Sequence, residues 1–360
     1  MNIADQRTRG RAAAYAGRHF HGLRPRRTAL LAGALAVGAS CAVAGCAAGG
    51  TSASGSEGLT LSAATTSAAQ LTAGQSGDFQ VLTLNDNRDR TFNQLLGIND
   101  EGQIVGYFGS GSAGQPNKGY ALRAPYAQGD FGSENFPRSA QTQITGLNDA
   151  GISVGFFSTQ NGATPADDNN FGFWREDGRY HEVNYPTKNN SKPPVNQLLG
   201  INDTGTAVGF YTDSAGNAHG YAYNISTRRF KLVTVPGATS LTVTAINNKG
   251  TVAGFFTNKK GTVDAFLKQH SGRISTIAVP GASMTQAFGL NDSGEVVGAY
   301  TTGTGNNAVS HGFTWLNGKF VTVNFPKASA TTVNGVNDEG DIVGFYTDAK
   351  GNTDGFVGLP

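Results

Sequence analysis

The sequence is poor in cysteine, histidine and charge, on which many catalytic and redox sites depend. Its 360 residues include two cysteines and six histidines, and charged residues make up 14% of the chain. The cysteines, Cys41 and Cys46, both lie near the N-terminus, so the chain beyond them can form no disulfide and offers no thiolate to a metal or substrate. Redox chemistry at cysteine is therefore excluded for that part of the chain.

A basic surface for nucleic acid is also missing beyond the first 45 residues. The formal net charge is +2, but seven arginines and one aspartate lie in residues 1–45, which leaves 20 basic and 24 acidic residues after them. A mildly acidic domain lacks the charge that binds a phosphate backbone, so we expect no nucleic acid partner. Phosphate-binding loops, zinc-ligand patterns and Gly-x-Ser-x-Gly turns are absent as well, so we predict no cofactor, no metal and no catalytic residue.

Residues 1–45 have the features of a lipoprotein signal peptide. An arginine-rich segment over 1–28 precedes an apolar run that is too short to span a membrane comfortably. The run ends in Val43-Ala44-Gly45-Cys46, which resembles the lipobox of bacterial lipoproteins, where the cysteine is lipidated and becomes the first mature residue. We expect export and a membrane anchor through the lipid on Cys46, with the protein facing the periplasm or the cell exterior.

Two alternatives for the leader stay open: an ordinary signal peptide, and twin-arginine export through Arg26 and Arg27. The segment after it, residues 46–77, consists mainly of Ala, Gly, Ser and Thr with one charge, Glu57. Such a composition cannot bury enough apolar surface to fold, so it predicts a flexible tether.

A repeat organises the rest of the chain. Six segments share an Asn-Asp-x-Gly corner, with Asn248 replacing the aspartate once, between an apolar strand and a strand rich in Val, Ile, Phe and Tyr. The spacings between successive corner asparagines are 49, 54, 45, 44 and 46 residues, and the asparagines are Asn99, Asn148, Asn202, Asn247, Asn291 and Asn337. A period of this length is typical of propellers and solenoids.

Four strands can be assigned to most periods. An aromatic residue marks the third strand, at Tyr120, Phe173, Tyr221, Phe266, Phe313 and Phe356, and a fourth strand ending in proline follows in units two to five. The first unit matches poorly, because Ala124 to Asn135 looks inserted. Residues 79–84 have the pattern of a fourth strand that the sixth unit lacks. We therefore predict an all-β, six-bladed β-propeller of four-stranded antiparallel blades over 78–360, closed by the N-terminal strand.

The repeats resemble the bacterial extracellular family named for a His-Ala-Phe triplet, in which Ile-Asn-x-x-Gly-x-Val-Val-Gly precedes the triplet. The likeness covers about residues 79–360. The triplet is replaced here by His219-Gly-Tyr221, His311-Gly-Phe313, Asp264-Ala-Phe266, Asp354-Gly-Phe356, Lys118-Gly-Tyr120 and Phe171-Gly-Phe173. The resemblance implies an exported repeat domain and brings no agreed activity with it.

One column of residues is the candidate ligand site. Five residues before each corner asparagine stand Gln94, Gln143, Gln197, Thr242, Gln286 and Thr332. If these polar side chains line the mouth of a channel, they suit a polar ligand, whereas the alternative is that they bond water or neighbouring backbone. The aspartates of the corners are assigned to turn chemistry rather than to calcium, because each corner offers one carboxylate. The aromatic residues that end the second strands are assigned to packing between units rather than to sugar stacking.

The leading hypothesis is an exported, lipid-anchored, non-catalytic binding or scaffold module at the cell envelope, with a polysaccharide or an envelope protein as its partner. The alternative is a carbohydrate-active or lyase-type propeller enzyme with a site at the channel mouth, because propeller enzymes assemble sites from residues far apart in sequence. A third possibility is a structural filler that arose by duplication of the repeat.

Overall fold

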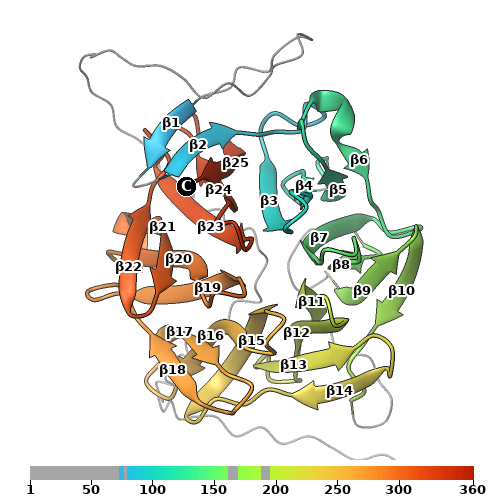
Figure 1. The fold of residues 1–360 in the computed structure, drawn as a ribbon, viewed down its shortest axis with the longest axis vertical. Coiled ribbons are helices and arrows are strands. Elements are labelled where there is room, and N and C mark those ends of the chain that lie inside the picture. The colour runs from blue at the N-terminus through green and yellow to red at the C-terminus, as the bar shows by residue number, and fades with distance from the viewer. Residues whose placement is uncertain (1–72, 77–78, 113, 161–168, 188–194) are drawn as a thin grey trace, which may run out of the picture. The chain divides into compact units, whose positions relative to one another are not determined.

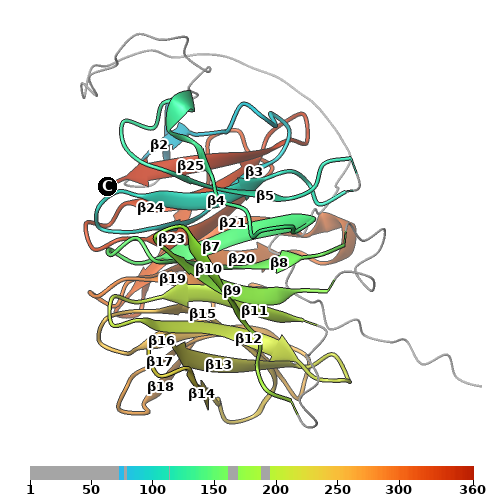
Figure 2. The same cartoon turned by 90° about the vertical axis from the view of Figure 1, so that its right-hand side faces the viewer.

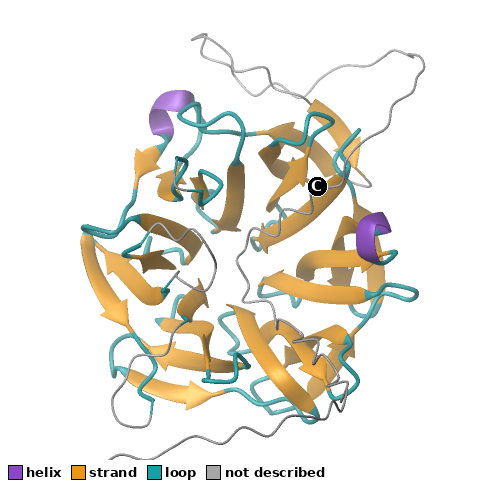
Figure 3. Cartoon of the chain, turned by 180° about the vertical axis from the view of Figure 1, so that it is seen from behind, coloured by secondary structure: helices purple, strands orange, loops and turns teal. Residues whose placement is uncertain are grey.

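The computed structural model describes residues 73–76, 79–112, 114–160, 169–187 and 195–360. All of them belong to the second of the two units into which the chain divides, residues 33–360. The expected signal peptide, Cys46 and most of the expected tether lie outside the described residues. Strands dominate the described part, with two single-turn 3-10 helices, η1 (Gln128–Asp130) and η3 (Gly305–Asn307) (Figure 3). None of the described helices is long and apolar enough to cross a membrane.

Each of the first five repeats forms an antiparallel sheet whose four strands pair in chain order, because a turn after each strand brings the next strand back beside it. The sixth repeat contributes three strands. The fold is therefore all-β, as the sequence predicts. The strands of the first three units are, in unit 1, β3 (Asn93–Ile98), β4 (Ile104–Phe108), β5 (Lys118–Leu122) and β6 (Gly132–Ser133); in unit 2, β7 (Gln141–Leu147), β8 (Ser153–Ser158), β9 (Phe171–Glu176) and β10 (Arg179–Val183); and in unit 3, β11 (Asn196–Ile201), β12 (Thr206–Thr212), β13 (Ala218–Asn224) and β14 (Arg229–Leu232).

The last three units follow the same plan, and one parallel bridge, Val263 to Met284, connects the sheets of units 4 and 5. Their strands are, in unit 4, β15 (Ala238–Ile246), β16 (Val252–Asn258), β17 (Val263–Lys268) and β18 (Ile274–Ile277); in unit 5, β19 (Met284–Leu290), β20 (Val296–Thr302), β21 (Val309–Leu316) and β22 (Lys319–Val323); and in unit 6, β23 (Ala330–Val336), β24 (Ile342–Thr347) and β25 (Thr353–Leu359).

The sixth sheet takes its fourth strand from the start of the described chain. Strand β2 (Phe79–Thr83) pairs antiparallel with β25, with Gln80 opposite Leu359, so the expected displaced strand is confirmed. Outside it lies β1 (Ala73–Ser76), which pairs with β2. Strand β1 falls within the segment assigned to the tether, so part of that segment is a strand. Strand β1 is a fifth strand at the edge of a sheet that already has four, and its Ala, Gly, Gln and Ser residues do not show the apolar alternation that identifies a strand.

The six sheets contact one another in sequence. The second strand of each unit lies against the first strand of the next, and β24 of unit 6 lies against β3 of unit 1. In Figure 1 the strands β3, β7, β11, β15, β19 and β23 lie innermost, around a common centre. Figure 2 shows β24 and β25 beside β3 from the side. The two ends of the repeat array are therefore in direct contact.

Glycines permit the close approach of the innermost strands. The first strand of every unit carries a bulge, and in five units a glycine lies at it, for example Gly97 and Gly146. A Cβ atom on Gly97 would come within 3.0 Å of the Cα of Gly146, and one on Gly335 would come within 3.2 Å of the Cα of Gly97. A larger side chain would push neighbouring units apart, which explains why glycine recurs just before the corner in the sequence.

Aromatic side chains fill the space between the sheets. The aromatic residue of each third strand is fully buried. Phe157 stacks on Phe136, which follows the last strand of the preceding unit, with ring centroids 3.7 Å apart. Tyr346 stacks in the same way on Phe325, at 3.7 Å. The expectation that these second-strand aromatics pack between units is confirmed at these positions, where large rings bury much apolar surface.

Candidate functional site

The polar column predicted as a ligand site lies largely between the sheets. Gln94, Gln143, Gln197 and Thr242 are 1%, 8%, 2% and 4% exposed, and Gln286 and Thr332 are partly buried. Four of the six side chains are therefore too buried to line an open mouth. Ligand binding by this column stays a prediction, and the structure does not bring the six side chains together around a cavity.

Three of the four glutamines of the column form hydrogen bonds with other side chains. Nε2 of Gln143 donates to Oδ1 of Asn117 in the preceding unit over 2.8 Å, and Gln197 makes the equivalent bond to Asn170 over 2.9 Å. In the first unit the hydroxyl of Tyr107 donates to Oε1 of Gln94 over 2.8 Å. The sequence identified the column as polar, but its partners lie on a neighbouring unit or strand and could not be read from spacing.

The corner asparagines meet around the centre, and each makes two kinds of hydrogen bond. Oδ1 accepts from the backbone N–H four residues later and closes its own turn, as Asn148 does for Ile152 at 2.9 Å. Nδ2 donates to the backbone oxygen of the corner asparagine in the next unit, as Asn148 does to Asn202 at 3.2 Å. Both contacts recur in all six units, and Asn337 of the last unit donates to Asn99 of the first at 3.4 Å.

The residues that directly follow the corner asparagines form a second circuit of hydrogen bonds. We call the two circuits together the axial ring. The backbone N–H of Asp100 donates to Oδ1 of Asp149 at 2.9 Å, and the pattern continues to Asp338, whose N–H donates to Oδ1 of Asp100 at 2.7 Å. Five positions of this circuit are aspartates and the sixth is Asn248. Its Nδ2 donates to the second carboxylate oxygen of Asp203 over 2.6 Å, which removes one like-charge contact from the circuit.

Crowding of these carboxylates disfavours their charged form. Burial is the main cause that raises the pKa of Asp149 from 3.8 to about 6; the neighbouring carboxylates of Asp100 and Asp203 contribute to this rise, and the backbone hydrogen bond from Asp100 opposes it. Burial also raises the pKa of Asp338, with Asp100 and Asp292 adding to the effect. The axial ring therefore carries less than its full negative charge in mildly acidic solution.

The axial ring encloses only a small space. The cavity at its centre has a volume of about 70 Å³ and is lined by corner residues of all six units. Small-molecule sites are several times larger. Within the described ranges, no group of three or more His, Cys, Asp or Glu side chains is arranged to hold a metal ion. Because the polar groups of the ring bind one another, its evident role is to hold the units together.

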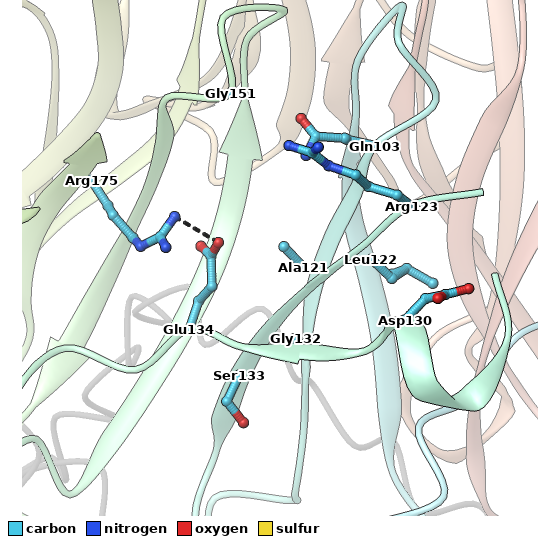
Figure 4. Close-up of a pocket in the computed structure, with 10 residues that line it drawn as sticks. All are labelled: Gln103, Ala121, Leu122, Arg123, Asp130, Gly132, Ser133, Glu134, Gly151 and Arg175. Atoms are coloured by element: carbon cyan, nitrogen blue, oxygen red, sulfur yellow. Dashed lines mark ion pairs between the residues drawn. The ribbon is translucent and has the colours of Figure 1, made fainter. Parts of the chain in front are cut away.

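A larger cavity, of about 410 Å³, lies between units 1 and 2 (Figure 4). We call it the inter-unit pocket. Its floor includes Ala121 and Leu122 of β5, and one wall is the insertion of unit 1, which contributes η1, the two-residue strand β6 and then Glu134. Arg175, at the end of β9, forms the opposite side. No other unit has this insertion, so the pocket breaks the repeat.

Glu134 and Arg175 form an ion pair inside the pocket. Oε1 of Glu134 lies 2.7 Å from Nη1 of Arg175, and the two side chains are 12% and 25% exposed. The hydroxyl of Ser153 donates to Oε2 of Glu134 over 3.1 Å. Burial raises the pKa of Glu134, and the guanidinium of Arg175, the Ser153 hydroxyl and the guanidinium of Arg123 each lower it. The carboxylate is thus held in place by partners from unit 2.

Arg123 faces the same pocket from the end of β5. With the Gln103 amide oriented so that its oxygen faces the guanidinium, Gln103 accepts hydrogen bonds from Nε and Nη2 of Arg123. The amide is neutral, and Arg123 forms no ion pair with any described residue. Arg175 Nε is buried without a hydrogen-bond partner among the described residues. The pocket therefore holds two guanidinium groups against one well-placed carboxylate.

The sequence contained one sign of this pocket, the poor match of residues 124–135 to the repeat. It could not show that Glu134 at the end of the insertion meets Arg175, because 41 residues separate them and the contact needs the packing of two sheets. The histidines give no such site. His219 bonds Asp213 of its own unit over 2.8 Å, and His311 bonds Asn324 over 3.2 Å.

No protein-family model matches the chain, and no curated protein matches it. Among solved structures, a protein of unknown function from Dyadobacter fermentans has 9% identity and a TM-score of 0.48, over 77% of this chain and 96% of that one. The Aleuria aurantia lectin, bound to Fucα1-6GlcNAc, has 9% identity and a TM-score of 0.43, over 74% and 91%. A polysaccharide lyase described as an ulvan lyase has 13% identity and a TM-score of 0.41, over 74% and 78%. Similarities at this level do not bear on what this chain binds.

Proposed function

We propose that the protein is an exported, lipid-anchored recognition module of the cell envelope, a closed six-bladed β-propeller that binds envelope polysaccharide in the inter-unit pocket without catalysis. The observation that carries this proposal is the pocket itself. It is large enough for one or two sugar residues, it is lined by charged groups with free hydrogen-bonding capacity, and it occurs only where the repeat is broken.

Two observations support a closed ring of blades. Strand β2 completes the sixth sheet, which leaves every unit with four strands. The hydrogen bonds from Asn337 to Asn99 and from Asp338 to Asp100 continue, between the last and first units, the pattern found between all other neighbours. A closed ring has no terminal blade whose face is left exposed, which favours stability in an extracellular protein.

Export and anchoring rest on the sequence. The lipobox-like Val43-Ala44-Gly45-Cys46 and the apolar run before it support lipidation of Cys46, and repeats like those of the His-Ala-Phe family support export. A lipid-anchored domain that stands off the membrane on a tether is well placed to hold a polysaccharide. Labelling with a radioactive fatty acid tests the anchor: we expect the label in the wild type and none in Cys46→Ser.

The binding proposal is tested by measuring how much polysaccharide from cell-envelope extracts is captured by the wild-type protein and by a variant whose pocket is blocked. Gly132→Phe is a suitable blocking variant, because a Cβ atom at Gly132 meets only the Ala121 oxygen, at an ordinary 3.5 Å, and the position lines the pocket. We expect the wild-type protein to retain polysaccharide and the variant to retain none at equal folding. Equal retention by both would show that the pocket is not the site.

A carbohydrate-active enzyme is the second candidate, favoured by the buried carboxylate of Glu134, whose raised pKa suits a general acid or base. Turnover of glycans by the wild type, lost in Glu134→Gln while binding persists, would establish this function in place of the non-catalytic one. Binding without turnover across a panel of envelope glycans would exclude it.

A further inference from the structure

We infer that the inter-unit pocket recognises an acidic polysaccharide, with the guanidinium of Arg123 binding the carboxylate of a uronic acid residue. This inference rests on the proposed function and specifies its ligand. It follows from the charges that face one another in the pocket and from which of them are already paired.

Two arginines and two acids line the pocket, and Arg123 is the arginine that forms no ion pair with a described residue. Arg175 and Glu134 neutralise each other at 2.7 Å. Asp130, the other acid of the lining, accepts a hydrogen bond from the backbone N–H of Ala127 at 2.7 Å, and in Figure 4 it points away from Glu134 and Arg175. Arg123 has only the neutral amide of Gln103 as a partner. A carboxylate on a ligand would supply the ion-pair partner that Arg123 lacks among the described residues.

The geometry suits a carboxylate on a sugar. A guanidinium presents parallel N–H groups that match the two oxygens of a carboxylate, and such charge-assisted pairs are among the strongest hydrogen bonds in proteins. In Figure 4 the Glu134 carboxylate lies between Arg175 and Arg123. Each of its oxygens accepts one hydrogen bond, from Arg175 or from Ser153, and has a second lone pair to accept a sugar hydroxyl. The pocket thus offers a donor for the acid and an acceptor for a hydroxyl.

The rest of the chain argues against a densely charged ligand. Beyond residue 45 acidic residues outnumber basic ones by 24 to 20, so a polymer with several charges per residue would be repelled at long range. One guanidinium without an ion pair matches one carboxylate per sugar residue. We therefore expect sulfated or phosphorylated saccharides to bind more weakly than uronates.

The test is isothermal titration of the purified protein with oligosaccharides of glucuronate, galacturonate and mannuronate, each compared with its carboxyl-reduced form. We expect at least one uronate oligomer to bind about tenfold or more tightly than its reduced form. Arg123→Gln should abolish that preference. Arg229→Gln is the matched control, since Arg229 is an exposed arginine on β14 of another unit, and it should bind as the wild type does.

The outcomes separate the inference from the proposed function. If the protein binds neutral, sulfated or phosphorylated saccharides as tightly as uronates, and Gly132→Phe abolishes that binding, the proposed function stands and the acidic ligand is wrong. Equal affinity of Arg123→Gln and the wild type for a uronate oligomer would also overturn the inference. If no saccharide binds to the wild type, both proposals fail. Circular dichroism of each variant confirms that the fold is intact.

Discussion

The axial ring and the inter-unit pocket are both rich in polar side chains, but they use them in opposite ways. In the axial ring the same two positions recur in every unit, with Asn248 the one departure, and their side chains form hydrogen bonds with a neighbouring unit. In the pocket the residues occur once, and Arg123 has no acidic partner among the described residues. Repetition thus marks the groups that hold the units together, and departure from the repeat marks the groups available to a ligand.

The largest expected effect follows from removing one corner asparagine of the axial ring. Asn202→Ala leaves the partly buried N–H of Thr206 without its partner and removes one of the two hydrogen bonds that the backbone oxygen of Asn247 accepts, the other coming from Gly250. We expect a loss of about 1.5–4.5 kcal/mol in the free energy of unfolding, since one unpaired group costs about 1–3 kcal/mol and the lost bond to Asn247 about 0.5–1.5 kcal/mol. Urea denaturation measures it.

Asn258→Ala is the control for that prediction. Asn258 also caps a turn, by accepting from the N–H of Lys260 at 2.9 Å, but it lies on an exposed hairpin and reaches no neighbouring unit. We expect a loss below about 1 kcal/mol, as for an exposed turn bond. Equal losses in the two variants would show that the bonds between units contribute nothing beyond turn formation.

A smaller effect is expected in the pocket. Arg175→Gln leaves the mostly buried carboxylate of Glu134 with only the Ser153 hydroxyl, and partial exposure limits the cost to about 1–2 kcal/mol. The double variant with Glu134→Gln removes the unpaired charge and should recover most of the loss in urea denaturation. If the double variant is as unstable as Arg175→Gln, the ion pair does not stabilise the junction.

A substitution that makes the axial ring uniform should destabilise it slightly. Asn248→Asp replaces the amide that bonds Asp203 with a sixth carboxylate, and like charges at such exposed positions cost about 0.5–1 kcal/mol. The loss in the free energy of unfolding should appear at low ionic strength and shrink in about 1 M salt, which screens repulsion between exposed charges. A loss that is the same at both salt concentrations would mean that charge is not its cause.

The smallest effect concerns the pH dependence of stability. Because the pKa of Asp149 is raised from 3.8 to about 6 in the folded protein, its contribution to stability is fully present below about pH 3.8 and is lost as the pH rises through 6. Asp149→Asn keeps an oxygen for the N–H of Asp100, as Asn248 does for Asp203. Thermal melts from pH 4 to pH 7 should therefore show a flatter profile in this variant than in the wild type.

Much of the secondary structure could be predicted from the sequence, because hairpin corners and aromatic third strands are local patterns. The corners at Asn99 and its equivalents, the strands beside them and the pairing of residues 79–83 with the C-terminal strand lie where the sequence places them. The two-residue strand β6 and the strand β1 were not predicted, since neither has the length or alternation that identifies a strand.

The candidate site could be predicted much less well. In the sequence each corner offers a single carboxylate. Only the packing of the units brings Asp100, Asp149 and Asp203 into a chain of hydrogen bonds. The column that includes Gln143 is predicted from its polarity to line the mouth of a channel. In the structure Gln143 and Gln197 are buried and bond side chains of the preceding unit. The pocket depends on an insertion, and an insertion has no equivalent in the other units from which its contacts could be inferred.

The contrast between structural ring and binding pocket is tested most directly by one binding measurement on three proteins. Retention of envelope polysaccharide is compared for the wild type, the pocket variant Gly132→Phe and the ring variant Asn248→Asp under conditions where all three are folded. We predict that the pocket variant loses binding and that the ring variant binds as the wild type does. Loss of binding in Asn248→Asp with retention in Gly132→Phe would contradict the account and place the ligand at the axial ring.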